Sequence, residues 1–153
     1  MSPRLFFRAV AIAEAITWTL LIIGLILKYM VQAGDLGVRI GGSIHGFVFL
    51  VYAASVVVVG VNQRWRFGTI AVGVVSAVVP YATIPFDVWA DRRGKLDGPW
   101  RRETTDDPRD ARWFDRLLRW LLRHPVAFGA IFVVGVVVVF TVLLVVGPPV
   151  PKA

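Results

Sequence analysis

The chain has 153 residues, of which 57% are hydrophobic and only 18% carry a charge. This balance is too apolar for a soluble domain of this length, so lipid is the expected solvent for much of the chain. The net charge of +7 does not indicate nucleic-acid binding, because the basic residues flank the apolar stretches instead of gathering on a soluble face. Because the chain contains no cysteine, disulfides, cysteine-bound zinc and iron–sulfur centres are excluded.

Four apolar stretches approach the length that a helix needs to cross a bilayer, about 20 residues for a hydrocarbon core of about 30 Å. They are residues 9–27, 44–61, 67–88 and 126–146. Arg4 and Arg8 ahead of the first stretch resemble the start of a signal peptide, but the apolar run is too long and contains Glu14, which favours a retained helix. The sequence thus predicts an all-α, multi-pass integral membrane protein of the bacterial plasma membrane with four transmembrane helices.

The connections between these stretches predict how the helices follow one another. Residues 31–43 are rich in glycine and suit a turn outside the membrane, and the short link at 62–66 makes the second and third stretches antiparallel neighbours. Pro80 and Pro85 remove backbone donors and are expected to kink or break the third helix in its second half. Residues 91–109 mix arginine and aspartate with glycine and proline, which indicates a charged loop with little core of its own.

Residues 110–124 are predicted to form an amphipathic surface helix. Four arginines at spacings of four, three and four residues lie on one stripe of this helix, with two tryptophans as interfacial anchors: Arg112, Arg116, Arg119, Arg123, Trp113 and Trp120. We expect the helix to lie in the headgroup plane with its arginines on anionic lipid phosphates; the alternative is a soluble helix packed on a partner protein. Pro125 then begins the fourth membrane helix, residues 125–147, which a tail at 148–153 follows.

The basic residues beside the membrane helices predict the orientation of the chain. With four spans, the first loop and the charged loop share one face and together carry twelve lysines and arginines, against five on the other face. This distribution places both termini outside the cytoplasm.

Glu14, His45 and Asp87 are ionisable residues in the predicted spans, where such residues are costly and by default suggest function. If His45 begins the second helix, it lies about 20 Å from Glu14 along the membrane normal, so no direct pair is expected. The same register brings Lys28, His45 and Asp87 into one cluster near an interface. That cluster is either a ligand, quinone or proton site or a hydrogen-bonded contact that fixes the helix ends. Glu14 is expected to be a buried carboxyl group that bonds to its neighbours.

No catalytic, cofactor-binding or metal-binding residues are predicted. His45 has no second histidine at ligand spacing, and the chain has neither a phosphate-binding loop nor a nucleophile motif. Gly42 and Gly46 form a small-xxx-small pair, which predicts close packing of another helix, either from this chain or from a partner.

Several short motifs occur together in the first part of the chain. They are Phe7-Arg8-Ala9-Val10-Ala11 with Glu14, Leu27-Lys28-Tyr29, Gly42-Ser43-Ile44-His45-Gly46 with Phe49 and Tyr52, Arg64-Trp65, Pro80-Tyr81-Ala82-Thr83 and Phe86-Asp87. This set, within residues 5–92, resembles the small three-helix family of bacterial membrane proteins of unknown function that includes the YdzA-like proteins. The resemblance implies a three-helix membrane unit at residues 5–90, to which the arginine helix and the fourth membrane helix are additions, and it carries no assigned activity.

The bias toward valine, alanine and arginine, with little lysine, is typical of a high-GC actinobacterium. Small membrane proteins of this kind resemble the association factors of the actinobacterial cytochrome bcc and oxidase respiratory supercomplex. The prediction is therefore a noncatalytic accessory or assembly subunit that contacts larger membrane subunits and anionic lipids, and not nucleic acid. The alternative is a small homo-oligomeric transporter or channel that uses Glu14 and His45. An enzyme is not expected, because a histidine and an aspartate without a nucleophile or a metal give little support for catalysis.

Overall fold

The computed structural model describes residues 1–104 and 106–147, and every regular element in these ranges is helical. The elements are α1 (Pro3–Tyr29), α2 (Leu36–Asn62), α3 (Phe67–Ser76), α4 (Thr83–Arg92), the 3-10 helix η1 (Pro108–Ala111), α5 (Trp113–Arg123) and α6 (Pro125–Val146). Three of them, α1, α2 and α6, are long and apolar enough to cross a membrane. The predicted tail at 148–153 lies outside the described residues.

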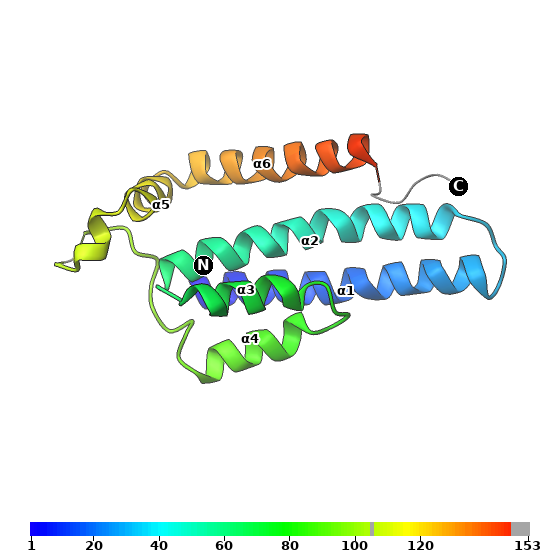
Figure 1. Cartoon of the computed structure of the whole chain (residues 1–153), viewed down its shortest axis with the longest axis horizontal. Coiled ribbons are helices and arrows are strands. Elements are labelled where there is room, and N and C mark those ends of the chain that lie inside the picture. Colours follow the sequence, from blue (N-terminus) through cyan, green and yellow to red (C-terminus); the bar gives the residue numbers. More distant parts are fainter. Residues whose placement is uncertain (105, 148–153) are drawn as a thin grey trace.

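Helices α1 and α2 form a long antiparallel hairpin, the blue and cyan helices of Figure 1. Their backbones touch where glycines face the partner helix. A Cβ atom on Gly24 would lie 2.6 Å from the carbonyl oxygen of Gly37, and one on Gly41 would lie 2.8 Å from that of Leu20. Because lipid is as apolar as the side chains, close van der Waals contact of this kind is a main force that holds membrane helices together.

Gly42 and Gly46, the predicted packing pair, lie outside this backbone contact. A Cβ atom on Gly42 would meet only a leucine methyl group, at 3.8 Å, and one on Gly46 would lie 3.5 Å from the ring of Phe140 in α6. Gly46 thus faces α6, while Gly42 has room for a side chain. The small-residue pair on α2 that meets the α1 backbone is Gly37 and Gly41, which has the same spacing and lies five residues earlier.

The third predicted span is not one helix. Residues 67–88 are divided between α3 and α4, each of ten residues, with a break at 77–82. Each helix is about 15 Å long, half of the hydrocarbon thickness, and α4 runs back toward the end where α1 begins (Figure 1). The expectation of four full spans is therefore corrected to three long helices and one helical hairpin in the described ranges. Pro80 lies in the break, as expected, and Pro85 lies in the first turn of α4, where its missing N–H costs no intrahelical bond.

Side chains of α1 bond to the break between α3 and α4. The indole Nε1 of Trp18 donates to the carbonyl oxygen of Ala77 at 3.2 Å, and the hydroxyl oxygens of Thr19 and Tyr81 lie 3.2 Å apart. Ala77 is fully buried, and Tyr81 adopts a left-handed backbone conformation with φ of 63°. Non-helical backbone inside a membrane is tolerated where protein satisfies its polar groups, and Trp18 does this for the carbonyl of Ala77.

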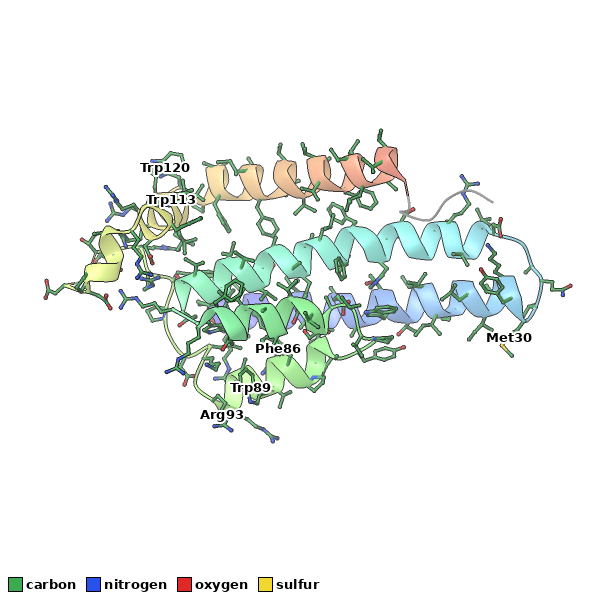
Figure 2. The ribbon with its side chains drawn as sticks, in the orientation of Figure 1. Met30, Phe86, Trp89, Arg93, Trp113 and Trp120 are labelled. Atoms are coloured by element: carbon green, nitrogen blue, oxygen red, sulfur yellow. The ribbon has the colours of Figure 1, made fainter. Side chains whose placement is uncertain are left out.

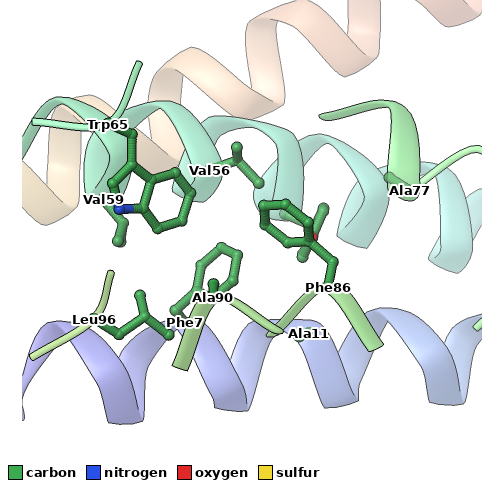
Figure 3. Packing of buried hydrophobic residues seen from close by; sticks show 10 residues of the cluster. Phe7, Ala11, Val56, Val59, Trp65, Ala77, Phe86, Ala90 and Leu96 are labelled. Carbon is green, nitrogen blue, oxygen red and sulfur yellow. The ribbon is translucent and has the colours of Figure 1, made fainter. Parts of the chain in front are cut away.

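The apolar core lies at the end of the molecule where α1 begins. The ring of Phe7 packs against Tyr52, Trp65 and Phe86 with centroid distances of 5.7, 5.8 and 6.1 Å. These residues come from α1, α2, the link before α3, and α4, so four segments meet around one ring; Figure 3 shows Phe7 between Trp65 and Phe86. Leu96 from the charged loop joins the cluster and is almost completely buried.

The charged loop therefore has more structure than predicted. The indole Nε1 of Trp65 donates to the carbonyl oxygen of Lys95 at 2.8 Å, and the Asn62 amide donates to that of Pro99 at 3.1 Å. Arg101 donates to the carbonyl oxygens of the last two residues of α2, Val61 and Asn62. Since the final carbonyls of a helix have no partner within it, the loop caps α2 and is fixed to it.

Helix α5 leads directly into α6, which runs alongside α2 (Figure 1). The contact between α2 and α6 is narrow. Phe47 packs edge-to-face on Phe140 with centroids 5.9 Å apart, and Val136 is the buried residue of α6. Most other side chains of α6 are exposed, so in a bilayer this helix presents a wide apolar surface to lipid or to another protein.

Candidate functional site

Charged side chains line the contact between α1 and α4, which we call the α1–α4 seam. Arg8 binds two aspartates: its Nε is 3.0 Å from Asp87 Oδ2, and its Nη2 is 2.7 Å from Asp91 Oδ2. Arg4 also binds Asp91, at 2.7 Å. The two arginines are one turn apart on α1 and the two aspartates are one turn apart on α4, so antiparallel packing places opposite charges face to face.

Asp91 lies at the end of α4, next to the charged loop, and its ionisation is controlled by these contacts. Burial by itself raises the pKa of Asp91, because it disfavours the charged form. The hydrogen bonds and charges of Arg4 and Arg8 outweigh burial, so the net result is a lowered pKa. Asp91 is thus kept ionised, and its carboxylate joins the start of α1 to the end of α4.

Glu14 lies about 9 Å deeper along the same seam, six residues after Arg8, and is fully buried. Its Oε2 lies 3.0 Å from the hydroxyl oxygen of Thr83, the first residue of α4. That hydroxyl is also 3.2 Å from the carbonyl oxygen of Ala11. The second carboxyl oxygen, Oε1, has no hydrogen-bond donor among the described residues.

Thr17 connects this region to His45 of α2. Its hydroxyl donates to the carbonyl oxygen of Glu14 at 2.9 Å and lies 3.2 Å from His45 Nδ1. Because a hydroxyl has a single hydrogen, donation to Glu14 requires His45 to carry a hydrogen on Nδ1. The ring of Trp18 packs on the imidazole with centroids 4.3 Å apart. Glu14 and His45 thus belong to one buried polar region that also includes Thr17 and Thr83.

The register of α1 and α2 corrects the predicted separation of Glu14 and His45. Helix α2 begins at Leu36, so His45 lies nine residues inside it and opposite Thr17, not at its start. The two groups are therefore about one helical turn apart in depth, and the expected separation of about 20 Å is wrong.

The predicted cluster of Lys28, His45 and Asp87 does not form. Lys28 Nζ is 3.0 Å from the carboxylate of Asp35, beside the turn between α1 and α2. Asp87 binds Arg8 at the other end of α1, because α4 runs back along α1 instead of continuing away from it. The three groups thus lie at three different depths.

Thr17 and Thr83 of the buried polar region and Arg8 of the α1–α4 seam were not identified as site residues from the sequence. One signal for the seam was available. Arg4 and Arg8 are four residues apart, and so are Asp87 and Asp91, which is the spacing of complementary charges on two packed helices. The spacing could be used only if the reversal of the chain before α4 was known.

A second charged cluster joins the loop to α5. Three arginines and three aspartates form its ion pairs: Arg64, Arg101, Arg119, Asp107, Asp110 and Asp115. Arg119 is only 5% exposed and donates to the carbonyl oxygen of Asp110 at 2.6 Å. This arginine points into the protein, which corrects its predicted place on a lipid-facing stripe.

The other arginines of the predicted stripe lie at the surface. Arg112 and Arg116 are exposed, and Arg123 is exposed while its Nε donates to the carbonyl oxygen of Arg102 at 2.7 Å. The stripe is therefore divided between a buried structural arginine and three outer ones.

Aromatic side chains cover the outer face of α5. Trp113 and Trp120 are 60% and 50% exposed and lie on the outside of the helix (Figure 2). Phe114 stacks on Trp113 with centroids 3.5 Å apart, and Leu117 continues the same exposed face. Leu118 and Leu122 point inward. The helix is amphipathic as predicted, but its exposed face carries both aromatic and basic side chains.

Three apolar grooves lie on the outside of the helices. The first, of about 450 Å³, lies between α3 and α4 and is lined by Phe86 and Trp89 among others. The other two lie between α2 and α6: one of about 510 Å³ includes Phe132, and one of about 300 Å³ includes Gly42. Glu14 and His45 line none of the three. In the parts of the chain that the structure describes, no three His, Asp or Glu side chains gather as metal ligands would.

Comparison with known proteins agrees with a membrane location. The family model described as "Domain of unknown function (DUF3817)" matches residues 5–92, the part that forms α1 to α4. A Streptomyces coelicolor protein named "Putative membrane protein SCO5905" is 44% identical over 94 residues, which cover 61% of this chain and 11% of that protein. The chain thus matches about a tenth of the length of this relative. No solved structure matches the chain.

Proposed function

The chain belongs to the family described as "Domain of unknown function (DUF3817)", and we propose that it is a noncatalytic accessory or assembly subunit of a larger membrane complex. One observation carries the proposal. A region 44% identical to this chain makes up 11% of a much longer Streptomyces coelicolor membrane protein. A unit that is covalently joined to a large membrane protein in one case is suited to pack against one as a separate chain in another.

The arrangement of the buried polar groups supports a noncatalytic role. Arg8, Asp87 and Asp91 bind one another, and Glu14 bonds to Thr83 between packed helices. A catalytic site needs a cavity in which substrate reaches its reactive groups, whereas the grooves described above are lined by apolar side chains that these groups do not reach.

The specific complex that we propose is the actinobacterial cytochrome bcc and oxidase respiratory supercomplex. The composition of the chain and its resemblance to supercomplex association factors support this choice, together with a Streptomyces relative. Docking would use the exposed apolar surface of α6 and the side of α2 that carries Gly42, where a side chain has room and the fold does not need the glycine.

The experiment is copurification of a tagged full-length chain in mild detergent, followed by native electrophoresis and mass spectrometry. We expect the chain to migrate with larger membrane subunits and cytochrome absorbance. Gly42→Leu should weaken this association, whereas Gly68→Leu, which enlarges a glycine of α3 away from this surface with open space around it, should not. A chain that migrates only as itself in several mild detergents contradicts the accessory role; association with larger subunits that lack haem contradicts only the choice of complex.

We also propose that α5 lies in the headgroup region and binds anionic lipid phosphates. Its exposed face joins tryptophans with Arg112 and Arg116, the composition of a helix at a membrane surface. In proteoliposomes, brominated anionic lipid should quench the fluorescence of Trp113 and Trp120, and Arg112→Gln with Arg116→Gln should reduce the preference for anionic over zwitterionic lipid. Quenching that is equal for both lipids and unaffected by the substitutions argues instead for a protein partner.

A small homo-oligomeric transporter or channel is the second candidate. The proximity of Glu14 and His45 favours it: Thr17 bonds to the main-chain carbonyl of Glu14 and to the His45 ring, so two ionisable residues lie close together inside the helices. Ion or proton flux into proteoliposomes that is the same for the wild type and for Glu14→Gln removes this candidate.

A further inference from the structure

The groove between α3 and α4 follows the whole length of the helical hairpin. The residues that line it recur at spacings of three and four, so each helix contributes one face: Thr69, Val72, Ser76, Ala82, Phe86 and Trp89. Thr69 and Trp89 lie toward the end of the bundle where α1 begins. Ser76 and Ala82 lie at the reversal of the chain. The groove therefore runs from that end of the bundle, which we call its mouth, to the reversal.

The floor of the groove is the ring of Phe86. A Cβ atom on Gly73 would lie 2.8 Å from Phe86 Cζ, so the ring fits against α3 because residue 73 has no side chain. Phe86 is only 6% exposed, and the ring of Trp89 lies beside it with centroids 5.6 Å apart. The Ser76 hydroxyl donates to the carbonyl oxygen of Gly73 at 2.7 Å, so the protein already satisfies this polar group. The groove thus offers an apolar surface to whatever occupies it.

The depth of the groove matches one leaflet of a bilayer. Each helix of the hairpin has ten residues and is about 15 Å long, half of a hydrocarbon core of about 30 Å. The acyl chain of a phospholipid also extends from the headgroup to the middle of the bilayer. A membrane-spanning helix of a partner would meet the hairpin over only half of its own length. The length of the groove therefore favours an acyl chain as its occupant.

Basic side chains surround the mouth of the groove. Arg66 directly precedes α3 and Arg93 directly follows α4, and both are exposed. Figure 2 shows Arg93 beyond Trp89 at the end of α4. Lys95 Nζ lies 5.5 Å from the centroid of the Trp89 ring, which lines the groove. Among the described residues, none of these three cations forms an ion pair.

Acidic side chains near the mouth do not cancel this charge. Asp91 binds Arg4 and Arg8 across the α1–α4 seam, so its carboxylate is already paired. Asp97, in the loop after α4, is exposed to solvent and forms no ion pair within the described ranges. The mouth therefore keeps a net positive charge, which complements an anionic headgroup.

We propose that the α3–α4 groove is a binding site for one acidic phospholipid, with an acyl chain along Phe86 and Trp89 and the phosphate at Arg66, Arg93 and Lys95. Trp89 would then lie at the level where chain and headgroup meet, the depth that tryptophan prefers in membrane proteins. The site is separate from α5, and it binds lipid whether or not the chain docks on a larger complex, so this proposal does not depend on the accessory role.

Photo-crosslinking of the purified full-length protein tests the proposal. The protein is reconstituted into vesicles whose phosphatidylglycerol or phosphatidylcholine carries a diazirine on one acyl chain, and the labelled peptides are identified by mass spectrometry. Labelling of α6, whose apolar side chains are widely exposed, measures ordinary contact with lipid. We expect the ratio of α3–α4 labelling to α6 labelling to be at least about fivefold higher with phosphatidylglycerol, since one basic residue near an anionic lipid contributes about that factor.

Val72 and Val75 provide a matched pair for the acyl chain. They are 59% and 61% exposed on the same helix, but only Val72 lines the groove. Val72→Trp should fill the groove and lower α3–α4 labelling to the level of α6, whereas Val75→Trp should leave the ratio unchanged. Circular dichroism and thermal unfolding establish that each variant retains the fold.

A second pair of variants tests the headgroup. Arg93→Gln with Lys95→Gln should lower the preference for phosphatidylglycerol by about fivefold for each residue removed. Arg112→Gln with Arg116→Gln removes the same charge from the exposed face of α5, and it should leave the α3–α4 ratio unchanged.

Three outcomes overturn the proposal. Equal labelling of the hairpin and α6 with both lipids means that the groove holds no particular lipid. Enrichment at the hairpin that is the same for both lipids means that the basic mouth does not select the headgroup. Enrichment that Val72→Trp leaves unchanged means that the acyl chain lies outside the groove. The first two outcomes are read from the wild type alone, so they hold even if a variant fails to fold.

Discussion

Arg8 joins α1 to α4 through two ion pairs. Its guanidinium lies between two carboxylates that α4 presents one turn apart, and one of them, Asp87, is only 3% exposed. Polar contacts between membrane helices are commonly of modest strength, but a buried charge left without its partner is costly. Losing the contact would leave the buried carboxylate of Asp87 without a partner, and that penalty is larger than the stabilisation that the contact itself provides.

We predict that Arg8→Met destabilises the protein by about 3 kcal/mol, the low end of the range for breaking a buried pair, since Arg8 itself is partly exposed. Arg66→Met, at an exposed position, should change stability by less than about 0.5 kcal/mol. Denaturant unfolding in detergent micelles, followed by tryptophan fluorescence, measures both.

The double variant Arg8→Met with Asp87→Leu should recover much of the loss, because no buried charge remains without a partner. If the double variant loses as much unfolding free energy as the two single variants do together, the broken contact between Arg8 and Asp87 is not the cause of the destabilisation.

At the scale of elements, the helices themselves could be predicted from the sequence better than their pairing. The apolar runs led to α1, α2 and α6, and the arginine spacing led to α5, because length and periodicity are local properties. The start of α2 could not be predicted in this way, since Gly37 and Gly41 look like loop residues until a partner backbone is there to receive them. That error in one boundary misplaced His45, and with it the whole predicted cluster.

The reversal at 77–82 shows a similar limit. Pro80 signalled a break, but a kinked span and a hairpin of two half-length helices have the same proline pattern. The choice depends on Trp18, which donates to the carbonyl of Ala77, on Thr19, which bonds to the Tyr81 hydroxyl, and on Arg8, which binds the returning helix. These contacts join residues that are far apart in the sequence. The sequence could therefore indicate which residues form the candidate site, but not which of them lie together.

The two glycine pairs of α2 provide a test of this packing. Gly41→Ala should destabilise the protein by about 1–3 kcal/mol, because the added Cβ would lie 2.8 Å from the backbone oxygen of Leu20 and force the helices apart. Gly42→Ala should be neutral or stabilising by up to about 1 kcal/mol, since its Cβ has space and alanine favours the helix.

Unfolding midpoints of the two alanine variants, measured side by side in the same detergent, check this prediction. The two residues are adjacent in the chain and equal in helix propensity, so the difference between them reports packing alone. A larger loss for Gly42→Ala would show that the face predicted from the sequence, and not the one seen here, holds the helices together.

At the scale of the whole molecule, three long helices and a returning hairpin change the orientation expected from charge. The first residues, the α2–α3 link and the charged loop with α5 all lie at one end of the bundle, and α6 leads away from it (Figure 1). Fourteen of the seventeen lysines and arginines belong to this end, against Lys28 and Arg39 at the other end of the described chain. Basic flanking residues favour the cytoplasm, so this end is expected inside, which reverses the predicted position of the N-terminus.

Cysteine accessibility tests this orientation without background, because the chain has no native cysteine. We expect a membrane-impermeant maleimide to label Ala33→Cys, in the exposed α1–α2 turn, in intact cells. Ser2→Cys and Asp97→Cys, at exposed positions of the basic end, should react only after lysis. Labelling of Asp97→Cys in intact cells would place the basic end outside. Opposite results for Ser2→Cys and Asp97→Cys would mean that the segment with α3 and α4 crosses the membrane after all, because only a returning hairpin keeps both positions on one face.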